Sequence, residues 1–277
     1  MLSAWLRHHL HQTPFSRGIR KVPGVRIFAE RWWRLTQRSA LKDALTAVKA
    51  PLLPDNYYSE VDIPSTSEVA KRDPRTVSKG DAFSSEMAAW CNTSKFQTMG
   101  YQDVYARATA HLRGKRPRVL EVGIGINDPR SPSGMTKDHK PGASLVGWAN
   151  YFPGAEVHGA DVDRRVLVDT ELYQTHLVDQ RDFDSLSNLG NALGAPLHLI
   201  VDDGLHTPEA NGLTIRALLP YLAMDGVAIV EDILPEHDEL WMKARKWIPS
   251  DYEMTFYRGK VLRSETKSGL AVFRRLR

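Results

Sequence analysis

Two short apolar runs that end in carboxylates constrain the fold of this chain more than any other feature. One covers 198–206 and reads HLIVDDGLH, and the other covers 226–232 and reads GVAIVED. Short apolar runs bounded by polar residues are typical of strands buried on both faces, as in a parallel sheet covered by helices. Because ligands of such sheets bind beyond the carboxyl ends of the strands, the two acidic ends predict an active site.

The spacing of neighbouring strands predicts the chemistry of that site. Adjacent strands lie about 4.8 Å apart, so Asp203 and Asp232 could bind one divalent cation between them. His206 stands beside them and is suited to accept a proton, because a free imidazole has a pKa of about 6.5. Helix capping is the structural alternative for the aspartates, but residues 207–209 already supply a threonine N-cap, a first-turn proline and an acid.

A third apolar run, RVLEVGIG at 118–125, ends in a glycine turn that suits a ligand lying against bare backbone. The dinucleotide fingerprint needs a third glycine where Asp128 stands, and prolines delay the next helix to about Ala143. A ligand without phosphates therefore fits better. The next run ends in Asp161, which is suited to hold two ribose hydroxyls; Asp163 is a near competitor, and either acid could instead cap the next helix.

Seven short motifs in this order resemble the class I S-adenosylmethionine-dependent methyltransferases. They are EVGIG (121–125), PGASL (141–145), YFPGA (151–155), GAD (159–161), VDQ (178–180), DDGLH (202–206) and VED (230–232). Within that class they are most similar to the metal-dependent sugar O-methyltransferases of macrolide pathways and to cephalosporin hydroxylase-type sequences. The resemblance covers roughly residues 92–235. It implies a Rossmann-like α/β fold with a seven-stranded methyltransferase sheet. Residues 254–257 and 270–273 read as two final strands on either side of a basic turn, and the resemblance implies that they form the hairpin that completes this sheet.

The resemblance also implies roles for individual residues. Asp203 and Asp232 would bind magnesium, and His206 would be the general base. Residues implied to contact the cofactor S-adenosylmethionine (SAM) are Glu121, Gly123 and Gly125 at the methionine end, Asp161 at the ribose, Asp179 and Gln180 near the adenine, and Asp202. A capping helix preceded by Lys95 and Tyr101 would close over the cofactor. Manganese is the alternative metal, since both ions favour oxygen ligands.

Two departures from the family concern the acceptor side of the site. The loop 126–140 is longer than expected for the antibiotic enzymes, and Leu205 stands where they usually have a small polar residue. A macrolide substrate is therefore not implied.

Composition agrees with one catalytic domain and appendages. The 277 residues are 42% hydrophobic and 25% charged, which is enough for a full core around one large sheet. The single cysteine, Cys91, excludes an intrachain disulfide and a thiolate metal cluster. We predict three parts: a basic amphipathic N-terminal extension (1–60), a linker with cofactor-capping helices (61–115), including a short helix near 84–90, and a Rossmann-like methyltransferase core (116–277).

The extension is the basic part of the chain. Residues 1–50 contain ten basic and two acidic side chains, although the whole chain has a net charge of only +4. Apolar residues at helical spacing among these charges favour an arm that packs on the core or on a second subunit. Peripheral contact of residues 1–50 with the inner face of a membrane is the alternative. A homo-oligomer and an organellar transit peptide stay open.

These observations predict a cytoplasmic SAM-dependent O-methyltransferase. Its acceptor would be a hydroxyl of a sugar, glycan or glycosylated small molecule, with divalent-metal assistance and His206 as general base; no nucleic-acid partner is expected. The alternatives are a nicotinamide-dependent oxidoreductase and a non-catalytic Rossmann-like binding protein tethered by its basic arm.

Overall fold

A computed structural model of the chain describes residues 74–97, 99–128, 135, 139–194, 196–238, 241, 248–258 and 268–276. The predicted N-terminal extension, with its proposed membrane or subunit contacts, lies outside these residues. So do the first part of the predicted linker and most of the long loop 126–140. None of the described helices is long and apolar enough to cross a membrane.

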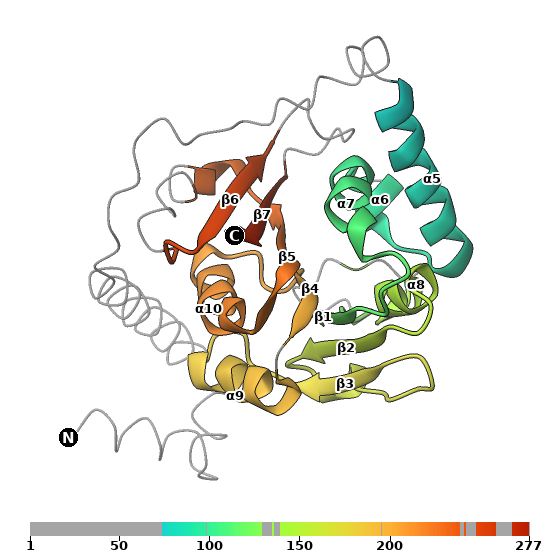
Figure 1. Cartoon of the computed structure of the whole chain (residues 1–277). Coiled ribbons are helices and arrows are strands. Elements are labelled where there is room, and N and C mark those ends of the chain that lie inside the picture. The colour runs from blue at the N-terminus through green and yellow to red at the C-terminus, as the bar shows by residue number, and fades with distance from the viewer. Residues whose placement is uncertain are drawn as a thin grey trace, which may run out of the picture. The chain divides into compact units, whose positions relative to one another are not determined.

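The sheet has the seven strands that the sequence predicts (Figure 1). They are β1 (Arg118–Val122), β2 (Glu156–Asp161), β3 (Gln174–Leu177), β4 (Leu197–Asp202), β5 (Leu222–Ile233), β6 (Tyr252–Tyr257) and β7 (Gly269–Arg275). Their order is β3-β2-β1-β4-β5-β7-β6, with β1 to β5 parallel and β7 antiparallel to both of its neighbours. The predicted C-terminal hairpin is therefore confirmed, and the strands that end in acids, β4 and β5, are neighbours.

Helices cover both faces of this sheet (Figure 1). They are α5 (Pro74–Trp90), α6 (Ser94–Gln97), α7 (Gln102–Thr109), α8 (Ala143–Tyr151), α9 (Phe183–Leu193) and α10 (Pro208–Leu218), with short 3-10 turns η1 (Ala110–Leu112), η2 (Arg164–Val166), η3 (Leu219–Tyr221) and η4 (Pro235–His237). Helix α8 begins at the predicted position, and Thr207 caps α10 by accepting a hydrogen bond from the backbone of Ala210. The predicted start of the short helix at 84–90 is wrong, because α5 begins at Pro74. Helix α5 is held by packing on α7 and α8, and its weak apolar pattern does not reveal these contacts.

Alternation along the strands sorts the core into two layers. Val119, Val201 and Ile229 point toward α5, α7 and α8, whereas Leu120 and Val230 point toward α9 and α10. This follows from the two-residue period of a strand. The same rule decides which face the side chains of Glu121, Asp202 and Glu231 occupy near the strand ends.

An aromatic cluster fixes α5, α6 and α7 against the first of these faces. The ring centroids of Phe83 and Phe96 lie 4.8 Å apart, and those of Phe96 and Tyr105 lie 5.4 Å apart. The Tyr105 ring is in turn 5.4 Å from that of Trp148 in α8. Edge-to-face and tilted contacts of this kind are favourable beyond their buried area. Segments upstream of β1 are therefore packed beside the carboxyl ends of the central strands.

Candidate active site

Three carboxylates from the central strands point toward the same face of the sheet. Glu121 lies on β1, Glu231 on β5, and Asp203 directly after β4. In the β4–β5 ladder Asp202 is paired with Val230, so Asp203 and Glu231 follow at the same level. Glu121 and Glu231 are each only 1% exposed. Because such charges are costly to bury alone, each needs partners from the covering helices.

Asp202 points to the opposite face and braces the following loop. Its carboxylate is fully buried and accepts hydrogen bonds from Gln180 Nε2 (2.6 Å), the Gly204 backbone (3.2 Å) and Asn211 Nδ2 (3.1 Å). Burial raises the pKa of Asp202, and the hydrogen bonds from Asn211 and Gly204 oppose that rise. Gln180 Oε1 accepts from the backbone of Leu205 at 2.8 Å. Both side chains thus position the loop through intramolecular bonds, and their assignment to the cofactor stays a prediction.

Two left-handed residues turn side chains back over the site. Asp232 and His206 both have φ of +52°. Simple alternation would send Asp232 to the face opposite Glu231, but the β5–β7 register shifts between Val230 and Ile233, as at a bulge. The hydroxyl of Tyr101 donates to the Asp232 carboxylate. A left-handed conformation costs a non-glycine residue roughly 1–2 kcal/mol, and such residues cluster at functional sites.

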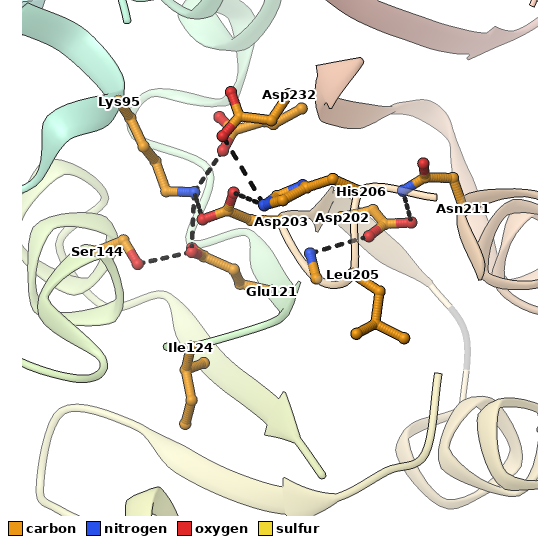
Figure 2. Close-up of polar contacts among 12 residues, drawn as sticks. Lys95, Glu121, Ile124, Ser144, Asp202, Asp203, Leu205, His206, Asn211 and Asp232 are labelled. Carbon is orange, nitrogen blue, oxygen red and sulfur yellow. Dashed lines mark hydrogen bonds and ion pairs between the residues drawn. The ribbon is translucent and has the colours of Figure 1, made fainter. Parts of the chain in front are cut away.

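Asp203, His206 and Asp232 form the group that could hold a metal ion. One ligand atom of each lies within 4.8 Å of those of the other two. His206 Nε2 is 3.9 Å from Asp203 Oδ1 and 3.8 Å from Asp232 Oδ2 (Figure 2). Burial and the charge of Asp203 raise the pKa of Asp232. The sequence-predicted triad is therefore brought together, and its donor set of two carboxylates and an imidazole fits a divalent cation.

Lys95 lies at the centre of the carboxylates (Figure 2). Its Nζ is 2.5 Å from Asp203 Oδ2, 2.5 Å from Glu231 Oε2 and 3.3 Å from Glu121 Oε1. Burial alone would lower the pKa of Lys95, but the charges of Asp203, Glu121 and Glu231 outweigh it and raise that pKa well above the usual range. Lys95 is therefore held as an ammonium ion and is not suited to act as a general base.

The two buried glutamates are held by further donors from the helices. Glu121 accepts hydrogen bonds from Ser144 Oγ and Trp148 Nε1, both at 2.7 Å. Glu231 Oε1 accepts from the Tyr105 hydroxyl at 2.6 Å. Glu231 and Tyr105 were not among the predicted site residues. Strand alternation in β5 offers the one sequence signal for Glu231, because it places this residue on the face of Val227 and Ile229.

Gly123 lets the β1 loop meet the loop after β4. It has φ of +90°, and its backbone N–H donates to the Ala160 carbonyl at 2.8 Å. A Cβ atom on Gly123 would lie 2.3 Å from the carbonyl oxygen of Asp203, which real Cβ atoms do not tolerate. Gly125 also has a positive φ, of +76°. The glycines predicted to approach the cofactor are thus required by the backbone geometry of this loop.

The remaining predicted cofactor residues lie further along the same sheet edge. Asp161 Oδ2 accepts a hydrogen bond from the Ile124 backbone at 3.1 Å, and its Oδ1 accepts from that of Asp163 at 2.9 Å. Asp179 forms an ion pair with Arg181 at 2.7 Å. Asp161 therefore ties the end of β2 to the glycine loop. The proposed ribose and adenine contacts of Asp161 and Asp179 stay predictions.

The curated proteins similar to this chain include several sugar O-methyltransferases; no family model matches it. Mycinamicin VI 2''-O-methyltransferase of Micromonospora griseorubida is 28% identical over 150 residues, or 54% of this chain and 35% of that protein. Demethylmacrocin O-methyltransferase of Streptomyces fradiae is 29% identical over 129 residues, or 47% of this chain and 30% of that protein. This chain thus covers about a third of the length of these relatives.

Among solved structures, the chain is similar to the MycE methyltransferase from the mycinamycin biosynthetic pathway in complex with Mg, SAH and mycinamycin VI. The TM-score is 0.54 with 21% sequence identity, over 72% of this chain and 54% of that chain. Crystal form 1 of MycE in complex with Mg and SAH gives a TM-score of 0.53 with 21% identity, over 72% of this chain and 55% of that chain. At this identity the likeness establishes the fold, which is the Rossmann-like fold of the SAM-dependent methyltransferases.

Proposed function

We propose that this chain, which has the fold of the SAM-dependent methyltransferases and is similar to sugar O-methyltransferases over about half its length, is itself a SAM-dependent O-methyltransferase. Its acceptor is a hydroxyl of a sugar, glycan or glycosylated small molecule. The convergence of Asp203, His206 and Asp232 at the carboxyl ends of β4 and β5 carries the proposal. Neither rival class, a nicotinamide oxidoreductase or a non-catalytic binding protein, explains why two residues with a strained backbone, His206 and Asp232, turn their side chains toward Asp203.

Asp203 and Asp232 are the residues that would hold a divalent cation, magnesium or manganese. Their side chains are each 26% exposed, unlike the buried glutamates beside them, so they can exchange water for a ligand. When bound, such an ion lowers the pKa of a coordinated hydroxyl and orients it. The two carboxylates would also repel each other less with a cation between them.

His206 is the proposed general base. In the reaction the acceptor oxygen forms a bond to the methyl carbon, the carbon–sulfur bond of the sulfonium breaks, and the hydroxyl proton passes to His206 Nε2. Its Nε2 lies 3.9 Å from Asp203 Oδ1 and 3.8 Å from Asp232 Oδ2, so it stands within reach of a hydroxyl held between the two carboxylates.

The donor side of the site is proposed along the glycine loop. SAM would lie against the backbone at Gly123 and Gly125, with its methionine end toward Glu121 and its ribose toward Asp161. Glu121 is fixed by Ser144 and Trp148, so its part is to hold the shape of the loop rather than to move with the ligand. This places the sulfonium beside the acid-lined end of β4, as in-line transfer to an oxygen requires.

Calorimetric titration with S-adenosylhomocysteine (SAH) tests the proposal. We expect a dissociation constant on the order of micromolar. A parallel titration with NADH, followed by its fluorescence, should give no saturable signal. Complete absence of SAH binding would overturn the assignment, and saturable NADH binding in its place would favour the oxidoreductase.

Replacing His206 by glutamine should lower turnover by roughly a hundredfold, because a positioned general base contributes about that much or more. The loss should stay near this lower limit, since a metal-activated hydroxyl can still release its proton to water. The measurement is SAH formation with the best acceptor from a panel of glycosides. His111, an exposed histidine whose Nε2 lies 2.6 Å from the carbonyl oxygen of Asp225, provides the control as His111→Gln. Equal turnover of the His206 variant and the wild type would exclude the base role.

A further inference from the structure

The charges of the site do not balance by themselves. Four carboxylates meet on the α6–α8 side of the sheet, those of Glu121, Asp203, Glu231 and Asp232. Lys95 contacts three of them, and the fourth is held by the Tyr101 hydroxyl. Even with Lys95 protonated, this group carries an excess of negative charge whenever its carboxylates are ionised. An excess of this kind attracts a cation.

The three partners of Lys95 are not equivalent. Glu121 and Glu231 are buried, so their ionised forms depend on a counter-ion that stays in the core. Asp203 is a quarter exposed, and its Oδ1 faces His206 while its Oδ2 faces the ammonium group. Asp203 is therefore the partner that a divalent ion in the triad can share or take (Figure 2).

We propose that Lys95 is a positioning residue that competes with the divalent cation for Asp203 and so sets the metal affinity of the site. This inference rests on the metal-assisted function proposed above. In the metal-free protein, Lys95 neutralises Asp203 and keeps its Oδ1 turned toward His206. When an ion binds, the ammonium group keeps Glu121 and Glu231 as partners, so it stays in the site and repels the new charge.

Lys95→Met tests this role, because methionine has a similar length and no charge. By calorimetry, Mg²⁺ should bind this variant about tenfold more tightly than the wild type, or tighter still. The metal-free variant should unfold at a lower temperature, since two buried carboxylates lose their counter-ion. Mg²⁺ should then raise its melting temperature by more than it raises that of the wild type.

Two further variants separate the charge at Lys95 from general effects. Lys95→Arg keeps the charge and should bind Mg²⁺ about as the wild type does. Lys115→Met removes an exposed lysine that is paired with Asp225 at 3.0 Å, and it should change neither Mg²⁺ affinity nor melting temperature. If Lys95→Met does not fold, Lys95→Met combined with Glu231→Gln removes both charges, and Glu231→Gln alone is its reference.

This inference would be overturned if replacing Lys95 by methionine left Mg²⁺ binding unchanged or made it weaker, either in the wild-type chain or in the Glu231→Gln variant. If neither the wild type nor any variant binds Mg²⁺, the metal site and the role of Lys95 both fail. The methyltransferase assignment is judged separately, by SAH binding without metal.

Discussion

Asp203→Asn should lower Mg²⁺-dependent turnover by about a thousandfold or more, because a Lewis-acid metal supplies several kcal/mol of transition-state stabilisation. Asparagine keeps the size and the backbone bonds of the residue, including the hydrogen bond from its N–H to the Val122 carbonyl at 2.8 Å. What changes is one charged ligand of the triad. Turnover is followed as SAH formation, and Mg²⁺ binding by calorimetry.

The same variant should keep SAH affinity within about threefold, since a change of less than 1 kcal/mol is expected at a residue that holds no part of the cofactor. Asp225→Asn is the matched control: Asp225 lies on β5, the strand that carries Asp232, but its carboxylate pairs with Lys115 on the surface. We expect it to retain wild-type turnover. A fully active Asp203→Asn protein would contradict the metal site.

Gly123→Ala should destabilise the protein by about 3 kcal/mol or more, because left-handed strain adds to a backbone collision. The added Cβ would lie 2.3 Å from the Asp203 carbonyl oxygen and 2.6 Å from the Gly204 Cα. Since neither atom belongs to a flexible side chain, the two loops must separate. The variant should therefore also lose measurable SAH binding, because the glycine loop is the proposed cofactor surface.

Gly114→Ala isolates the conformational part of this effect. Gly114 also has a positive φ, of +76°, but a Cβ there would meet no atom within 4 Å. Gly114→Ala should lower the free energy of unfolding by only about 1–2 kcal/mol and leave SAH binding unchanged. Both free energies of unfolding come from urea titrations. Equal stability of the two variants would show that the β1 loop does not pack against the loop of Asp203 as described.

Much of the sheet could be predicted from the sequence because its strands are short apolar runs with acids or glycines at their ends. This pattern located β1, β2, β4 and β5. Two further strand-like runs at 254–257 and 270–273, together with the resemblance to the methyltransferases, predicted the terminal hairpin. Helix α5 was placed less well. Its position depends on Phe83 and Met87 packing against α7 and α8, and such contacts leave little periodic trace in a sequence.

The adjacent acids Asp202 and Asp203 show most clearly what a sequence pattern leaves undecided. The sequence places Asp202 and Asp203 together, and strand alternation sends one to the α10 side and the other to the site. Strand spacing and the family resemblance indicate Asp203 as the acid of the metal site, but alternation alone does not say which face of the sheet holds that site, since this depends on the helices that cover each face. The DDG motif by itself therefore predicts a site at this strand end, but not which aspartate faces the site and which one braces the following loop.

The amino-acid sequence by itself determined the strand ends, and hence the edge of the sheet where Asp203, His206 and Asp232 could meet. Tertiary structure alone decided that they do meet: a register shift and two left-handed residues turn Asp232 and His206 inward. It also placed Lys95 among the carboxylates, whereas the family resemblance had put this residue only ahead of a capping helix; Lys95 is 108 residues from Asp203 and 136 from Glu231 along the chain. The physical reason is that strand ends are set by local pattern, whereas the partners of a buried charge are chosen by packing between distant segments.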